Sequence, residues 1–205
     1  MKKYAQSRTD FAGNGEAFAR HLLHQLGLDE SVNVEIVKAG DHYDPIAKAV
    51  RLSQKFSQQT SLTAIVIAAH EVGHVIQDFE QLSLFKKRIL LAKIMQFIQY
   101  IAPITLTVAP ILLFFTKSIL LSGFVVGIGF LSIAMNTLFH LITLPVEWDA
   151  SFNKALPILV GGEYLTKEED IKAAHTILKA AALTYVSQSL FNLLNIAYWL
   201  RLLKR

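Results

Sequence analysis

The sequence contains no cysteine, which excludes both a disulfide framework and metal sites built on thiolates. It is also poor in charge, because Asp, Glu, Lys and Arg make up 18% of its 205 residues, against about 25% in an ordinary soluble domain. Hydrophobic residues reach 53%, which excludes a disordered chain, since disorder requires low hydrophobicity. The length corresponds to one domain, or one domain with an appendage.

The few charges are unevenly distributed along the chain. Asp, Glu, Lys and Arg are absent from residues 94–116, 118–146 and 180–200. Each of these stretches is as long as the ~20 apolar residues that cross a bilayer core. We therefore expect helices at roughly 89–116 and 118–144 to form a transmembrane hairpin. A last helix, about 171–203, is expected to be a third crossing or an interfacial helix.

The placement of basic residues indicates the expected partners. The first ten residues have no apolar segment, so no signal peptide or anchor is expected there. Basic side chains instead flank the apolar stretches, at Lys86–Arg88 and at Arg201, Lys204 and Arg205. This pattern suits anionic lipid headgroups, and no basic-aromatic RNA or DNA motif is visible. The sequence thus predicts a lipid bilayer as a partner and argues against nucleic acid.

Shorter patterns precede the first apolar stretch. Apolar side chains at helical spacing predict an amphipathic helix over 14–28. Alternation around Val34 and around Arg51 predicts two short strands joined by an ordered turn. A following helix, capped by Thr60 or Ser61, is apolar on nearly all sides. The expected fold class is α-rich α+β with a small β element.

This last helix contains an H-E-x-x-H sequence, His70-Glu71-Val72-Gly73-His74. Residues four apart share one helical face, so His70 and His74 can bind one metal ion, and Glu71 can reach a water on that ion. Zinc suits histidine, and a catalytic zinc has three protein ligands and an open fourth position. Glu71 is then the expected general base, and Gly73 leaves room for another chain segment. The alternative, two buried histidines and a carboxylate with no metal, would cost several kcal/mol.

The third ligand must come from elsewhere in the chain. The side chains considered are those of Asp78, Glu80, His140, Glu147, Asp149 and His175. Asp78 and Glu80 lie too close along the same helix, and His175 is on a solvated-looking helix face. His140 lies inside an apolar stretch, where a packed neutral histidine is more common than a metal ligand. Glu147 follows a long uncharged stretch, where a carboxylate needs a partner; this partner is the metal or, alternatively, a lysine.

Two further features concern the substrate. The segment DHYDP lines the active site, with His42 or Tyr43 as oxyanion donor, or it is a turn in which Asp44 binds backbone amides. The strand at 49–53 is a candidate for pairing with an extended peptide. Tyr185 is another candidate oxyanion donor.

Four segments in order carry a family resemblance. They are DHYDPIAKAVRLS (41–53), AAHEVGHVIQ (68–77), TLPVEWDAS (143–151) and AALTYVSQ (181–188). They resemble the YugP-like family of neutral zinc metallopeptidases, described as bacterial membrane proteases, over nearly the whole chain. The resemblance implies a zincin-type catalytic unit integrated with two or three transmembrane helices. It also implies zinc held by His70, His74 and Glu147, with Glu71 as base.

The chain departs from related patterns at two positions. The more distant HtpX-type membrane proteases have an aspartate four residues after the ligand glutamate, whereas this position is Ser151 here and the aspartate is Asp149. Asp149 is therefore a candidate for orienting a zinc-bound histidine, a role that the sequence leaves open. His140 stands where the family has a glutamine, which argues against a ligand role.

These observations predict a membrane-embedded zinc endopeptidase acting on peptides or proteins, including membrane proteins, near the membrane surface. We expect one integrated domain: the N-terminal part of the catalytic unit at 1–88, a transmembrane hairpin at 89–144, and the Glu147 segment with a C-terminal apolar helix at 145–205. A non-catalytic zinc-containing membrane scaffold is the alternative, but it has no need of Glu71. A metal-handling membrane protein is a second alternative, but it would be expected to carry more ionisable groups in its apolar stretches than this sequence does.

The expected location is the bacterial inner membrane. Basic residues gather on the side of the site, at Lys86–Arg88 and Lys154, whereas the turn of the hairpin has only Lys117. The positive-inside rule therefore predicts an active site that faces the cytoplasm.

Overall fold

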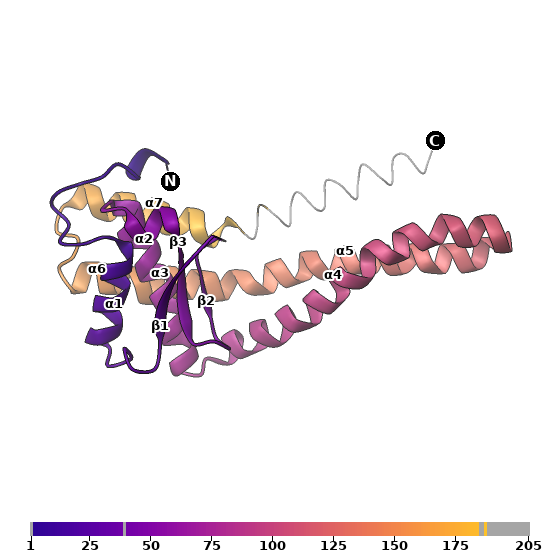
Figure 1. Ribbon diagram of the computed structural model, residues 1–205, viewed down its shortest axis with the longest axis horizontal. Helices are drawn as coiled ribbons and strands as arrows, with labels where there is room; N and C mark the ends of the chain where they lie inside the picture. Colours follow the sequence, from indigo (N-terminus) through magenta and orange to yellow (C-terminus); the bar gives the residue numbers. More distant parts are fainter. Residues whose placement is uncertain (1, 39, 185–186, 188–205) are drawn as a thin grey trace. The chain divides into compact units, whose positions relative to one another are not determined.

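The structure is a computed structural model, and it describes residues 2–38, 40–184 and 187 (Figure 1). The chain divides into two compact units. The first contains Met1–Phe85 and Val146–Leu183, and the second contains Lys86–Pro145 and Thr184–Arg205. The H-E-x-x-H sequence and Glu147 both belong to the first unit.

The first unit combines helices with one small sheet. Its elements are η1 (Lys2–Tyr4), α1 (Gly15–Gln25), β1 (Asn33–Val37), β2 (His42–Asp44), β3 (Ala49–Ser53), α2 (Gln54–Gln58), α3 (Leu62–Phe79), η2 (Asp149–Ala155), α6 (Leu156–Gly161) and α7 (Glu168–Ala182). The η2 segment is a π-helix that follows directly on α5 (Ile119–Trp148). The first unit is therefore built from two stretches of chain that are far apart in sequence.

Helix α3 forms the centre of the first unit. It contacts α1, α2, α6, α7 and η2, and also strands β2 and β3. Almost all of its residues are buried, because its sequence is apolar on nearly every side. Its N-terminus is capped by the Ser61 side chain, which accepts a hydrogen bond from the Ala64 amide. The predicted helix and its cap are confirmed.

The sheet has the strand order β1-β3-β2, with β3 parallel to β1 and antiparallel to β2. Strands β1 and β3 confirm the two that alternation predicts. Strand β2 was missed because three residues are too few to show a period of two. The proposal that residues 49–53 pair with substrate is wrong, because β3 is the central strand and has a partner strand on each side.

The turn between β2 and β3 depends on Asp44. One carboxylate oxygen accepts hydrogen bonds from the Ile46 and Ala47 amides at 2.8 and 3.0 Å, and the other accepts one from Arg51 at 2.6 Å. These backbone amides and the Arg51 charge lower the pKa of the Asp44 carboxyl. The interpretation of DHYDP as a structural turn is thus confirmed for Asp44.

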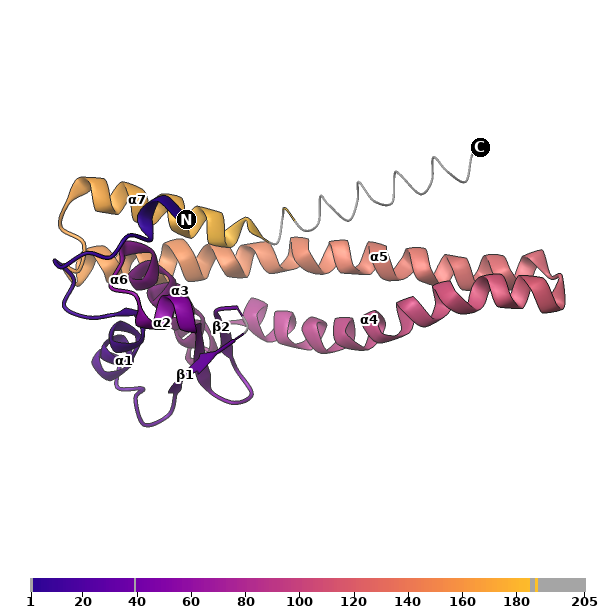
Figure 2. The same ribbon diagram turned by 45° about the horizontal axis from the view of Figure 1, so that its top comes forward.

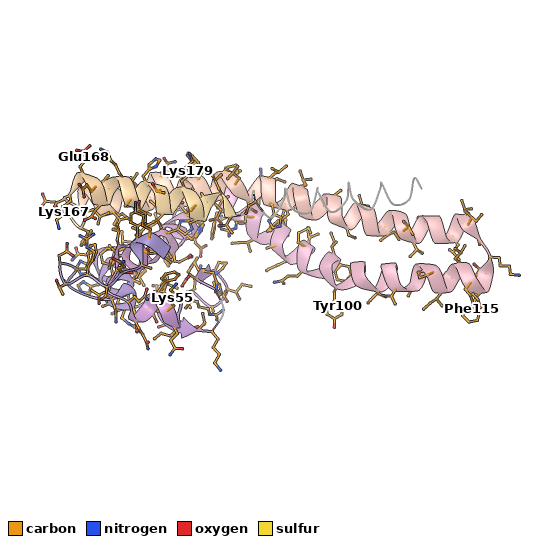
Figure 3. All side chains as sticks on the ribbon, turned by 90° about the horizontal axis from the view of Figure 1, so that it is seen from above. Lys55, Tyr100, Phe115, Lys167, Glu168 and Lys179 are labelled. Atoms are coloured by element: carbon orange, nitrogen blue, oxygen red, sulfur yellow. The ribbon has the colours of Figure 1, made fainter. Side chains whose placement is uncertain are left out.

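The second unit contains most of the long helices α4 (Ser83–Thr116) and α5. They run antiparallel and meet at a turn (Figure 2). Lys117, in this turn, has a φ of +51°. Helix α4 begins six residues before the predicted 89 and includes the basic triplet. Apolar side chains along both helices are exposed, among them Tyr100 and Phe115, which project from α4 in Figure 3.

The predicted transmembrane helices are wrong. Across the described parts of the chain, no helix has a stretch long and apolar enough to cross a membrane. The prediction depended on the spacing of charged residues, but a stretch without charges is not continuously apolar, as Gln96 and Thr107 in α4 and His140 and Thr143 in α5 illustrate. The expected location in the bacterial inner membrane, with a cytoplasmic active site, depended on these helices and is corrected with them.

The predicted last helix, 171–203, corresponds in part to α7. This helix begins three residues earlier, at Glu168, and ends at Ala182. Most of the predicted segment beyond Leu183, including Tyr185, lies outside the described residues.

Candidate metal centre

Helix α3 supplies two imidazoles from one face. The rings of His70 and His74 lie edge to face with centroids 4.8 Å apart, as four-residue spacing on a helix requires. Both side chains are buried, and so is Glu71. The helix thus presents two nitrogen donors and a carboxyl group in a region from which solvent is largely excluded.

The end of α5 supplies the third candidate ligand, the carboxylate of Glu147. The helix continues through Pro145 to Trp148, four residues beyond the predicted end at 144. The π-helical η2 follows, and π-helical turns occur often at functional sites. Glu147, in the last turn of α5, is only 2% exposed. Its carboxylate therefore points into the protein beside the two histidines.

Gly73 makes this approach possible. A Cβ atom at this position would lie only 2.6 Å from the carbonyl oxygen of Ala150 in η2, which is closer than real Cβ contacts come. Any side chain at residue 73 would push η2 away from α3. The prediction that Gly73 leaves room for another segment is confirmed, and that segment, η2, directly follows the last turn of α5, which carries Glu147.

The donor atoms converge on one point. The Nε2 atoms of His70 and His74 lie 3.2 and 3.4 Å from Oε2 of Glu147, and the possible ligand atoms of these three residues all lie within 4.8 Å of one another. Two donors on a tetrahedral zinc at ~2.0–2.1 Å are about 3.3 Å apart. The observed separations match this value. The donor set and its spacing therefore fit zinc, although the ligand roles stay predictions.

Glu71 lies in the electrostatic field of this cluster. Burial raises the pKa of its carboxyl, the charges of His70 and His74 oppose the rise, and the carboxylates of Glu147 and Asp41 add to it. A carboxyl group whose pKa is raised is a better proton acceptor when ionised. The electrostatic environment is thus compatible with Glu71 as a base.

The face of His74 that points away from the cluster contacts Gln77. Nδ1 of His74 lies 2.9 Å from Oε1 of Gln77, whose Nε2 donates to the Val146 carbonyl and to Oδ2 of Asp149, both at 2.8 Å. Asp149, the candidate for orienting a histidine, thus contacts Gln77 and not a histidine. Its other oxygen accepts a hydrogen bond from Asn153 at 2.8 Å.

His70 has a different neighbour on its outer side. Nδ1 of His70 lies 3.1 Å from the hydroxyl of Ser151, a fully buried residue of η2. This is the position at which the distant HtpX-type proteases have an aspartate. The hydroxyl can donate or accept a hydrogen bond, so it supports either tautomer of His70.

The other candidate ligands are engaged elsewhere or lie outside the cluster. Asp78 accepts hydrogen bonds from Tyr43 and Lys48, and Glu80 pairs with Lys154 at 2.6 Å. The exposed His175 packs against Phe152. His140 belongs to the second unit and has a pKa lowered by burial. The structure therefore brings Glu147 to the histidines and none of these four.

Of the candidate oxyanion donors, His42 and Tyr43 are not brought into the cluster either. His42 is exposed, and its Nδ1 contacts the Gly40 carbonyl at 2.8 Å. The Tyr43 hydroxyl donates to Asp78 at 2.7 Å, and burial together with this carboxylate raises the pKa of Tyr43. Tyr185 lies outside the described residues.

Sequence reasoning missed Gln77 and Phe85. Gln77 follows His74 by three residues on the same helical face, and this spacing could have identified it. Phe85, near the start of α4, stacks between His74 and Tyr43 with centroid distances of 6.1 and 6.5 Å. Nothing in its sequence position indicates this contact, because it depends on the turn between α3 and α4.

Comparisons with known proteins show the family to which the chain belongs. The sequence model of a family described as "Putative neutral zinc metallopeptidase" matches residues 1–204. A protein of Bacillus subtilis (strain 168), named "Putative membrane protease YugP", is 34% identical over 198 residues, which cover 96% of this chain and 83% of that protein. No solved structure matches the chain significantly.

Proposed function

Since the chain belongs to the neutral zinc metallopeptidase family, we propose that it is an endopeptidase in which His70, His74 and Glu147 hold the zinc and Glu71 is the general base. Its substrates are peptides or proteins. One observation carries the assignment: two imidazole nitrogens from α3 and a carboxylate oxygen from α5 converge at 3.2 and 3.4 Å in a buried position. A scaffold without activity would not need a buried Glu71 beside these donors.

The chain's own residues have distinct tasks in the reaction. Zinc, when bound, polarises the scissile carbonyl and lowers the pKa of water towards ~7. Glu71 accepts a proton from the attacking water on its carboxylate and delivers it to the nitrogen of the leaving amine. The buried position of the cluster limits competing solvent, which strengthens these electrostatic interactions.

The assignment is tested by Glu71→Gln, which keeps the size of the side chain but removes the base. We expect the variant to retain zinc while its hydrolysis of fluorescein-labelled casein falls by on the order of 10²–10⁴. Glu80→Gln is the matched control, because Glu80 lies just after the same helix and pairs with Lys154 outside the cluster. It should retain both zinc and activity. His70→Ala and His74→Ala should lose both.

Zinc content by mass spectrometry and initial rates with and without a chelator give the result. Proteolysis that is undiminished in Glu71→Gln, or that persists after zinc removal, would contradict the proposal. Wild-type protein that binds zinc but cleaves no peptide bond would instead support a non-catalytic scaffold.

A further inference from the structure

We propose that Gln77 is a positioning residue that fixes the tautomer of His74 and ties it to the segment that carries Glu147. The proposal rests on the proposed function, because it assigns a role at the same zinc site. It concerns a residue that contacts neither the metal position nor a substrate, and that acts through its hydrogen bonds alone.

The direction of these hydrogen bonds follows from the chemistry of the partners. The Val146 carbonyl and the Asp149 carboxylate can only accept, so the Gln77 atom 2.8 Å from both must be the amide nitrogen. The amide oxygen of Gln77 therefore faces His74. An oxygen there can only accept, so Nδ1 of His74 must carry the proton.

This tautomer is the one that a metal ligand requires. With its proton on Nδ1, the neutral imidazole has its lone pair on Nε2, the atom 3.4 Å from the Glu147 carboxylate. In the alternative tautomer, a proton would occupy Nε2 of His74, the atom to which zinc binds. Nδ1 of His74 and the amide oxygen of Gln77 would then face each other as two acceptors. The amide thus selects the binding-competent form of His74 before the metal arrives.

Gln77 also connects helix α3, which carries the two histidines, with the chain segment that carries Glu147. Its amide bonds Val146 and Asp149, one residue before and two residues after Glu147. The side chain is only 1% exposed, so water does not compete for these contacts. A single amide therefore sets the orientation of His74 relative to the chain segment on both sides of Glu147.

The arrangement at His70 provides an internal comparison. Its Nδ1 contacts the Ser151 hydroxyl, which is able to donate as well as accept. The hydroxyl does not select a tautomer. The proposed selection is thus specific to His74, and this difference between two ligands on one helix is measurable.

The first experiment replaces Gln77 by methionine, which preserves length and burial but removes every hydrogen bond. Nitrogen-15 NMR of histidine-labelled, zinc-free full-length protein reports the tautomer, and competition with a chromophoric chelator reports zinc affinity. We expect wild-type His74 to be protonated on Nδ1. Gln77→Met should show a mixture of tautomers and a zinc Kd raised ~10–100-fold. Ser151→Ala is the control and should leave the His74 tautomer unchanged.

A second variant distinguishes positioning from simple packing. In Gln77→Glu combined with Asp149→Asn, the new carboxylate can accept from His74 and the new amide can donate to that carboxylate. The Val146 carbonyl loses its donor and faces a carboxylate oxygen instead, so two acceptors lie against each other there. We expect this double variant to restore the single tautomer and to recover part of the lost zinc affinity, whereas Gln77→Met does neither.

Two results would overturn the proposal. One is an unchanged His74 tautomer and zinc affinity in Gln77→Met. The other is a folded double variant, by circular dichroism, that recovers neither property. The proposed function is tested separately, because zinc-dependent proteolysis by the wild type does not depend on which tautomer the zinc-free protein adopts.

Discussion

The two chain segments that meet at the metal centre are built differently. Helix α3 is a regular, capped helix that is buried on nearly every side, and its spacing alone sets His70 against His74. The junction of α5 and η2 runs through a proline into a π-helix and contributes one ligand, Glu147. Two ligands are thus fixed relative to each other by one helix, whereas the third is fixed by contacts between segments.

Three contacts hold the junction against α3. The Ala150 backbone abuts Gly73, Ser151 contacts His70, and Gln77 bonds Val146 and Asp149. Each contact lies within about one helical turn of a ligand. Changes at the junction should therefore alter the metal site while leaving α3 itself intact, and changes outside both segments should alter neither.

The largest expected effect comes from removing the ligand of the junction. Glu147→Ala should weaken zinc binding by more than the ~10–100-fold that loss of an outer hydrogen-bond partner costs, because one of three donors disappears. The loss of zinc affinity in Asp149→Asn should lie at or below that range, because Asp149 contacts Gln77 and not a histidine. Metal analysis and zinc titration of the purified variants decide between them. If Asp149→Asn alone loses zinc, the assignment of the two residues is reversed.

A smaller effect is expected from separating the two segments. Gly73→Ala introduces a Cβ atom 2.6 Å from the Ala150 carbonyl oxygen, so η2 must shift. We expect the free energy of unfolding to fall by ~1–3 kcal/mol, with weaker zinc binding. Urea denaturation and zinc titration measure the two effects.

The matched control is Gly161→Ala in α6, where an added Cβ meets no atom within 4 Å. Its free energy of unfolding should be unchanged or slightly higher, since alanine favours helix by up to ~1 kcal/mol. Equal stability and zinc affinity in the two alanine variants would show that the close approach at Gly73 is not required.

The smallest effect is expected outside both segments, at Asp44 in the β2–β3 turn. Its pKa is lowered in the folded protein, so the ionised form contributes stability that is present above the unfolded pKa of ~3.9 and is lost as the pH falls through the folded pKa. Asp44→Asn should lower the free energy of unfolding at pH 7 by on the order of 1 kcal/mol. Zinc affinity at pH 7 should be unchanged.

Denaturation of wild type and Asp44→Asn between pH 7 and pH 3 checks the sign. The difference between them should shrink towards the acidic end. A difference that grows as the pH falls, or a loss of zinc in the variant, would contradict this account of the turn.

The same comparison explains what could be predicted from the sequence. Helix α3, its Ser61 cap and the strands around Val34 and Arg51 follow from local periodicity and capping, which the sequence displays directly. Gly73 was also identified, because a glycine between two ligands on a buried helix indicates a close neighbour.

The junction was less predictable because its structure depends on tertiary contacts. The second apolar helix was predicted to end at 144, yet α5 continues through Pro145 to Trp148, because the chain beyond it packs on α3 as a π-helix. Asp149 was a candidate for orienting a zinc-bound histidine, but Gln77 lies between it and His74. Uncharged length alone led to the wrong prediction of transmembrane helices. In each case a one-dimensional pattern was consistent with more than one packing arrangement.

The most direct test of the account is diffraction from zinc-loaded crystals, with data collected on both sides of the zinc absorption edge. It predicts one zinc ion bound by Nε2 of His70, Nε2 of His74 and the carboxylate of Glu147. Nδ1 of His74 should remain in contact with Gln77. Zinc at another position, or a ligand set in which Asp149 replaces Glu147 or Nδ1 of His74 replaces Nε2, would contradict it.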